Sequence, residues 1–201
     1  TTAQAFRDFL SDTGLDKRIA DRLSTLNPED VRELAAAGAQ IREWIVEAPL
    51  PKRLNDDIKT AFARLDVDGK GSFAVRSSAT SEDSPDASFA GEHDTYLWVR
   101  GGDDVIDAVR RCWASLFTDR ATCYRVEMGY EHRSVEMCVV VQKMVRPKSA
   151  GVAFTLNPID GDRSQIAIDS AWGFGEGVVS GEITPDNFLV DKVVREIGRR
   201  V

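Results

Sequence analysis

Apolar and polar positions alternate with a helical period over the first third of the chain. Thr1 and Gln4 have the spacing of a capping box at a helix start, and Gly14 suits a helix end. Asn27 followed by Pro28 marks a second start, because a side-chain acceptor fits the cap and a proline fits the first turn. The apolar stripe that follows has the period of a buried helix face. Its members are Val31, Leu34, Ala35, Gly38, Ile41 and Ile45.

Two prolines, Pro49 and Pro51, end this stripe, and one more short helix is predicted after them. Its apolar members are Leu54, Ile58, Phe62 and Leu65. The acidic run 66–71 that comes next has some features of a calcium loop. With Gly69 at loop position six, however, an arginine and a valine occupy the first and twelfth positions, where acids are required. We therefore predict a turn and no calcium site.

The apolar period shortens after Ser72, which indicates strands. Residues 73–75 predict a short strand that enters the polar stretch 76–91. Residues 93–99 predict another extended segment, in which Tyr96 and Trp98, two positions apart, share one face.

Asp103 is predicted to cap a long helix that reaches Met128. Its apolar stripe is Val105, Val109, Cys112 and Leu116. Residues 135–145 are rich in β-formers, and their alternation predicts one shared face for Cys138, Val140, Gln142 and Met144. Further strands are predicted at 151–156, 165–168 and 187–190. Helices followed by strands favour an α+β fold with a helical segment, 1–71, and a strand-rich lobe, 72–201.

Composition narrows the function classes. The net charge is −7, and no basic stripe of the kind that binds nucleic acid is present in the sequence. No apolar run approaches the roughly 18 residues of a membrane span, and no apolar leader opens the chain, so we expect a cytoplasmic protein. Three cysteines without CxxC spacing and two histidines favour reduced thiols over a zinc site or a disulfide.

The polar stretch 76–91 is the first candidate for chemistry. An arginine followed by hydroxyl and small residues suits phosphate, because the guanidinium forks onto two oxygens and small residues let backbone amides approach. A solvated loop uses the same residue types and is favoured on composition alone. The chain contains no GxxxxGK[ST] sequence, so the stretch is not a Walker loop.

Three other features leave two interpretations open. The glycine-rich segment 171–181 lacks dinucleotide-loop spacing, and tight backbone packing is favoured over ligand contact. Gln142 suits either a structural hydrogen bond or the edge of a base, and neither is favoured. His93 and His132 are the two candidates for a phosphoryl-accepting histidine, and surface or structural roles are favoured for both.

Taken together, several long motifs resemble the nucleotide domain shared by phosphoenolpyruvate synthases, pyruvate phosphate dikinases and rifampicin phosphotransferases. The matching segments, in the order of that family, are 73–91, 94–97, 112–120, 139–145, 149–155 and 171–181. The segments 1–10 and 36–45 resemble the helical part of the phosphoenolpyruvate synthases, which are therefore the first choice within the family. The nucleotide domain of phenylphosphate synthase or rifampicin phosphotransferase, and a non-catalytic binding module on the same scaffold, are the alternatives.

The resemblance implies an ATP-grasp-like domain of a pyruvate, water dikinase, which turns ATP, pyruvate and water into AMP, phosphoenolpyruvate and phosphate. A phosphohistidine carrier domain and a pyruvate-binding domain of the same enzyme are the implied partners. The resemblance assigns the polyphosphate to Arg76 and to the backbone amides around Gly91, with Thr95 just beyond them and Gln142 beside the nucleotide.

The resemblance assigns no catalytic residue and no metal ligand to this chain. An ATP-contacting lysine is expected before Thr1, the Mg²⁺ ligands are expected after Val201, and the carrier histidine is expected on another domain. We therefore expect the isolated 201-residue chain to be catalytically inactive and to bind ATP weakly at best.

Overall fold

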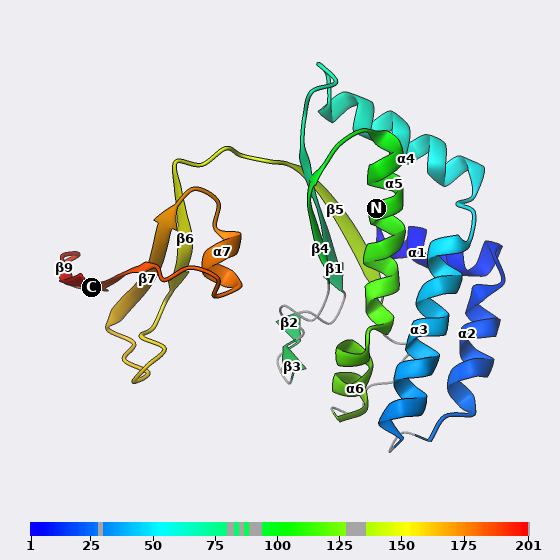
Figure 1. Ribbon diagram of the computed structural model, residues 1–201, viewed down its shortest axis with the longest axis horizontal. Coiled ribbons are helices and arrows are strands. Elements are labelled where there is room, and N and C mark those ends of the chain that lie inside the picture. Colours follow the sequence, from blue (N-terminus) through cyan, green and yellow to red (C-terminus); the bar gives the residue numbers. More distant parts are fainter. Residues whose placement is uncertain (28–29, 80–82, 85–86, 89–93, 128–135, 201) are drawn as a thin grey trace. The chain divides into compact units, whose positions relative to one another are not determined.

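The computed structural model describes residues 1–27, 30–79, 83–84, 87–88, 94–127 and 136–200 (Figure 1). These residues form a mixed helical and antiparallel fold of the α+β class, as predicted. The chain divides into two compact units, 1–144 and 145–201, which are described separately. The predicted boundary at 71/72 falls inside the first of these units and stays a prediction about domains.

The first unit is built on a three-stranded antiparallel sheet with the order β4-β1-β5. Its strands are β1 (Phe73–Ala79), β4 (Thr95–Val99) and β5 (Met137–Lys143). A separate two-residue ladder joins β2 (Asp83–Ser84) to β3 (Ala87–Ser88). The helices are α1 (Ala3–Asp12), α2 (Leu15–Ser24), α3 (Val31–Glu47), α4 (Lys52–Leu65), α5 (Gly102–Ala114) and α6 (Asp119–Glu127). A 3₁₀ turn, η1 (Ser115–Phe117), joins α5 to α6.

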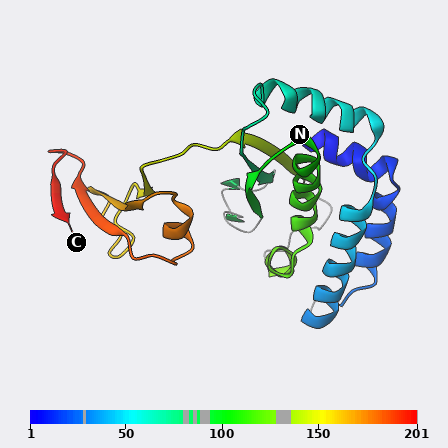
Figure 2. The ribbon, with the colours of Figure 1, turned by 45° about the horizontal axis from the view of Figure 1, so that its top comes forward.

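Figures 1 and 2 show the helices gathered on one side of this sheet, with α5 nearest to the strands. An aromatic cluster joins α1 to α5, where the Phe9 ring stacks on the Trp113 ring at a centroid distance of 5.0 Å. Both side chains have no exposed surface. Burial of each such ring contributes about 2–3 kcal/mol, so this cluster helps to hold the helices to the sheet.

The cap positions differ from the prediction by one to three residues. Thr2 caps α1 by accepting a hydrogen bond from the Ala5 amide, although Thr1 was expected there. Asp30 caps α3 in place of Asn27, because its carboxylate accepts from two amides of the first helical turn. Gly14, the predicted helix end, lies between α1 and α2 with a φ of +69°, which glycine adopts without strain.

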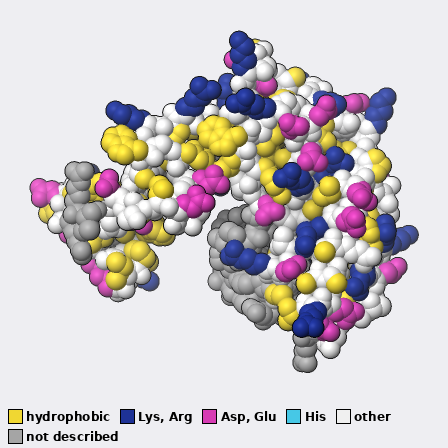
Figure 3. Space-filling view, viewed as in Figure 1, with side chains coloured by type: hydrophobic (Ala, Val, Ile, Leu, Met, Phe, Trp, Pro, Cys, Tyr) yellow, Lys and Arg dark blue, Asp and Glu magenta, His cyan; other side chains and the backbone are white. Residues whose placement is uncertain are grey.

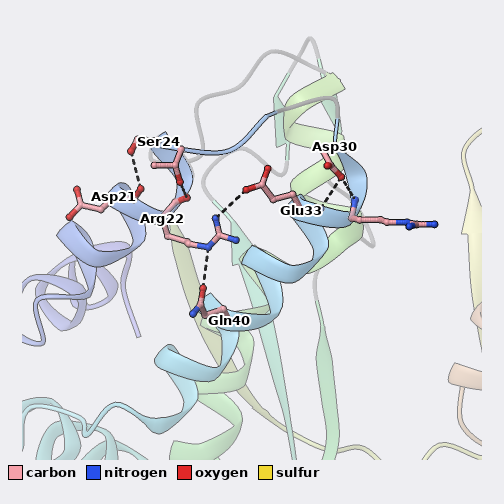
Figure 4. A network of polar contacts seen from close by, with 8 residues as sticks. Asp21, Arg22, Ser24, Asp30, Glu33 and Gln40 are labelled. Atoms are coloured by element: carbon pink, nitrogen blue, oxygen red, sulfur yellow. Dashed lines mark hydrogen bonds and ion pairs between the residues drawn. The ribbon is translucent and has the colours of Figure 1, made fainter.

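Figure 4 shows how α2 is joined to α3 by polar side chains. The Arg22 guanidinium donates to the side-chain Oε1 atom of Gln40 at 3.1 Å and lies 3.8 Å from a Glu33 carboxylate oxygen. On the same helix α3, the predicted stripe is buried at four positions, Leu34, Gly38, Ile41 and Ile45. Val31 is exposed, because it stands in the first turn next to the cap.

The long helix predicted from Asp103 to Met128 is interrupted. Gly101 is the N-cap of α5, and Asp103 lies in the first turn, where its carboxylate pairs with Lys59 at 2.8 Å. The predicted apolar stripe is nevertheless buried throughout, because η1 continues the same face. Arg42 of α3 donates to the carbonyl oxygen of Phe117, which secures the interruption to the helical layer.

The second unit is a four-stranded antiparallel sheet with the order β6-β7-β8-β9. Its strands are β6 (Ser149–Phe154), β7 (Gln165–Trp172), β8 (Asp186–Asp191) and β9 (Ile197–Arg200). One short helix, α7 (Glu176–Val179), packs on β6 and β7. The strands predicted here are confirmed, while β9 and α7 were not predicted. Within the described parts of both units, no helix has the length and apolar character to cross a membrane.

Candidate functional site

The sheet of the first unit has one buried face and one open face. Along β1, Phe73 and Val75 are fully buried toward the helices, whereas Arg76 is exposed. Alternate residues of a strand point to opposite faces. The open face therefore carries Arg76. The sequence had suggested that the strand ends before this arginine, but β1 extends to Ala79, so Arg76 lies within the strand.

Strand register brings three of the four predicted site residues onto this open face. Arg76 lies directly opposite Thr95 on β4 and Val140 on β5, and residues paired in this way share a face. Gln142 follows Val140 by two positions and is therefore a diagonal neighbour of Arg76, at about 7–8 Å between backbones. The side chains of Arg76, Thr95 and Gln142 are all exposed. The fourth predicted residue, Gly91, lies outside the described residues.

The surface between these polar groups is small and apolar. Ala74 pairs with Gln142 and is 7% exposed, so it forms a low floor in the middle of the sheet. Val140, beside Arg76, keeps 48% of its surface exposed. A guanidinium, a hydroxyl and a carboxamide around an apolar floor can hold a ligand that joins an anionic group to a flat, hydrogen-bonding group.

Sequence reasoning missed a cluster at the start of β4. The Tyr96 hydroxyl donates to the Asp94 carboxylate at 2.9 Å, and the Arg111 guanidinium lies 4.2 Å from the centre of the Tyr96 ring. Burial raises the pKa of Tyr96 to about 12. The i, i+2 spacing of Asp94 and Tyr96 on a strand was visible in the sequence, but the approach of α5 was not.

Tyr96 and Trp98 were predicted to share one face of their strand, but the pairing of β4 with β1 is irregular in this region. The register shifts between Phe73 and Val75, which pair with Val99 and Tyr96 respectively. One extra residue therefore lies on β4, and Trp98 has a φ of +60°, an unusual value for a bulky side chain. Strict alternation does not hold beyond Tyr96 for this reason.

The glycine-rich segment 171–181 follows the packing interpretation at two positions. A Cβ on Gly175 would lie 3.3 Å from the Ala150 Cβ, and one on Gly177 would lie 3.2 Å from the Ile183 side chain. Gly173 itself has a positive φ of 84°. Gly175 therefore lets the start of α7 approach β6 closely, and Gly177 leaves room for the Ile183 side chain.

The remaining candidates can be placed as follows. The run 66–71 is a turn, as predicted, in which the Asp66 carboxylate accepts from the Gly71 amide at 2.9 Å. His93 and His132 lie outside the described residues. Among the residues that are described, no group of three or more His, Cys, Asp and Glu side chains is placed to hold a metal ion. Figure 3 shows basic and acidic side chains interspersed over the visible face of the first unit.

One family model matches the whole chain, and known proteins match nearly all of it. The family model described as pyruvate phosphate dikinase, AMP/ATP-binding domain, matches residues 1–201. The phosphoenolpyruvate synthase of Pseudomonas aeruginosa is 50% identical over 203 residues, which is 99% of this chain and 26% of that protein. The Escherichia coli phosphoenolpyruvate synthase is 49% identical over 195 residues, covering 96% of this chain and 25% of that protein. The chain thus spans about a quarter of the length of these relatives.

Proposed function

Because the chain belongs to the AMP/ATP-binding domain family of pyruvate phosphate dikinase, we propose that it binds ATP on the open face of the β4-β1-β5 sheet. The observation that carries this proposal is the common face of Arg76, Thr95 and Gln142. These residues come from three strands, and the family resemblance assigned them to the nucleotide without reference to strand register. The proposed domain is ATP-grasp-like.

Each side chain has a separate task in the proposed complex. The Arg76 guanidinium binds polyphosphate oxygens, and the Thr95 hydroxyl on the neighbouring strand adds a neutral donor. The Gln142 carboxamide reads the hydrogen-bonding edge of the base, and the backbone amides near Gly91 cover the polyphosphate. Phosphoryl transfer depends mainly on positioning and charge neutralisation, so a domain of this kind contributes without a covalent residue of its own.

We further propose that the complete polypeptide is a phosphoenolpyruvate synthase. The support is an identity of 45–50% to relatives of that name over nearly the whole chain. In this proposal, ATP phosphorylates a histidine on a carrier domain, and the phosphoryl group passes to pyruvate on a third domain. Mg²⁺ is the expected metal of the full enzyme, and no step is assigned to it because the described residues offer it no ligand group.

The complete polypeptide is the protein to assay. Isothermal titration with ATP tests the binding proposal, and incubation with ATP and pyruvate tests the reaction. We expect AMP, phosphate and phosphoenolpyruvate to form in equal amounts, measured by chromatography and a phosphate assay. Formation of ADP in place of AMP would contradict the synthase proposal. Turnover that requires rifampicin or phenol in place of pyruvate would show that one of the other dikinase-like activities is the correct one.

A further inference from the structure

Asp94 stands between the stretch that contains Gly91 and the first residue of β4. Its exposed carboxylate accepts a hydrogen bond from the Tyr96 hydroxyl at 2.9 Å. Thr95, a proposed ATP contact, lies between these two residues. A bond between residues 94 and 96 therefore restricts the backbone on both sides of Thr95.

Helix α5 holds the Tyr96 side chain in place. The Arg111 guanidinium lies 4.2 Å from the centre of the Tyr96 ring, at cation–π distance, and one of its nitrogens lies 3.5 Å from an Asp107 oxygen. Tyr96 is half-buried, and burial raises the pKa of its hydroxyl to about 12. The hydroxyl therefore stays a neutral donor at physiological pH.

The backbone of Asp94 contacts the same helix. The Cys112 Sγ atom lies 3.8 Å from the Asp94 carbonyl oxygen and 3.8 Å from the Val75 carbonyl oxygen. Cys112 has no exposed surface and follows Arg111 on α5. Side-chain and backbone contacts thus join Asp94 to consecutive residues of one helix.

We propose that Asp94, Tyr96 and Arg111 form a positioning cluster. The cluster holds Thr95 opposite Arg76 and fixes the first residues of β4 in the position that binds ATP. This inference rests on the proposed function. The three residues act through the backbone and are not proposed to contact ATP. The other end of the β4 ladder is irregular, with a register shift between Phe73 and Val75, so regular pairing with β1 is confined to the start of β4. Without the cluster, the first residues of β4 would move relative to Arg76.

Loss of the cluster should affect ATP binding more than folding. The core that joins α5 to the sheet consists of fully buried side chains such as Val105, Val109 and Trp113, which the cluster does not include. Removing one partly exposed hydroxyl leaves this core unchanged. A residue with a merely structural role would change the melting temperature and leave the affinity for ATP as it was.

The test uses Tyr96→Phe in the complete polypeptide, because phenylalanine keeps the ring beneath Arg111 and removes only the hydroxyl. We expect the Kd for ATP to rise about fivefold, the order expected for loss of one typical hydrogen bond. The melting temperature without nucleotide should stay within about 2 °C. Asp94→Asn, which keeps an oxygen acceptor for Tyr96, should retain most of the affinity, whereas Asp94→Ala should match Tyr96→Phe.

Asp103→Asn is the matched control. Asp103 lies on α5, the helix of Arg111, and the change weakens its exposed pair with Lys59 of α4, away from the start of β4. It should leave the Kd for ATP unchanged. An affinity for ATP within 1.5-fold of the unmodified enzyme in both Tyr96→Phe and Asp94→Ala would overturn the inference and leave the proposed function standing. An unmodified enzyme that binds no ATP would instead overturn the proposed function, and this inference with it.

Discussion

Replacing Arg76 with glutamine should weaken ATP binding strongly while leaving the fold stable. The side chain is exposed on the central strand of its sheet, so the free energy of unfolding should change by no more than about 0.5 kcal/mol. Two charge-assisted hydrogen bonds to phosphate, at about 1.5 kcal/mol each, predict a loss of about 3 kcal/mol. That loss corresponds to a Kd for ATP that is roughly 150-fold higher.

The assay is isothermal titration of the complete polypeptide with ATP, accompanied by thermal unfolding without ligand. The affinity of Arg76→Lys for ATP should lie between those of the unmodified protein and Arg76→Gln, with a Kd about tenfold higher than that of the unmodified protein, because an ammonium keeps the charge without the planar fork. Arg100→Gln is the matched control. Arg100 is also exposed and follows Val99, whose partner Phe73 lies three residues from Arg76, so it is more than about 10 Å from Arg76 along the sheet and beyond the screening length at physiological salt. Equal affinity of Arg76→Gln and Arg100→Gln would refute the reasoning.

Three further outcomes follow from other parts of the first unit. Gln142→Ala should reduce discrimination between ATP and GTP, measured as the ratio of their Kd values, and an unchanged ratio would remove Gln142 from base recognition. Gly38→Ala should destabilise the chain by about 1–3 kcal/mol in urea unfolding, because the new Cβ atom would lie 2.6 Å from the Phe117 carbonyl oxygen. A neutral or stabilising effect would show that η1 moves away freely. Burial raises the pKa of Cys112 from 9.0 to about 12, so the unfolded thiol ionises first and stability should fall as pH rises from about 9. In Cys112→Ala, the urea midpoint should fall less steeply between pH 8 and about 11 than in the unmodified protein. An equal slope in both proteins would show that ionisation of Cys112 does not cause the loss of stability.

Helices and strands could be predicted wherever one face of an element is buried. The stripe of α3 and the alternation of β5 each follow from a single buried side, and both are confirmed. The ends were harder to predict, because neighbouring residues had equal chemistry: Thr1 and Thr2 can both cap, as can Asn27 and Asp30. Local propensity does not decide between them, since tertiary packing sets where the first turn begins.

The break between α5 and α6 illustrates a second limit. The apolar stripe through Cys112 and Leu116 continues across η1, so the periodicity that predicts a helix carries no sign of the interruption. At the break, the Thr118 hydroxyl accepts from the Ala121 amide at the start of α6, and α3 lies against the Phe117 carbonyl oxygen through Gly38 and the Arg42 guanidinium. A contact between segments that far apart in sequence leaves no local pattern.

Similar reasoning applies to the candidate site. The shared face of Gln142 and Val140 follows from alternation within one strand and was predicted. The pairing of Thr95 with Arg76 depends on the register between β1 and β4, where an extra residue interrupts regular counting, so composition and period alone could not provide it. The resemblance to a known family supplied Thr95 as a candidate, and the register then placed it beside Arg76.

The β4-β1-β5 sheet separates the proposed ATP site from the aromatic core by the thickness of a single backbone. Val75 packs among the helices, and the next residue, Arg76, faces outward. A substitution that displaces the backbone of Val75 is expected to displace that of Arg76 as well, since the two residues share one planar peptide. Variants of such a protein that are selected for altered heat tolerance should therefore often differ in nucleotide affinity as well, without a change at any residue that contacts the ligand.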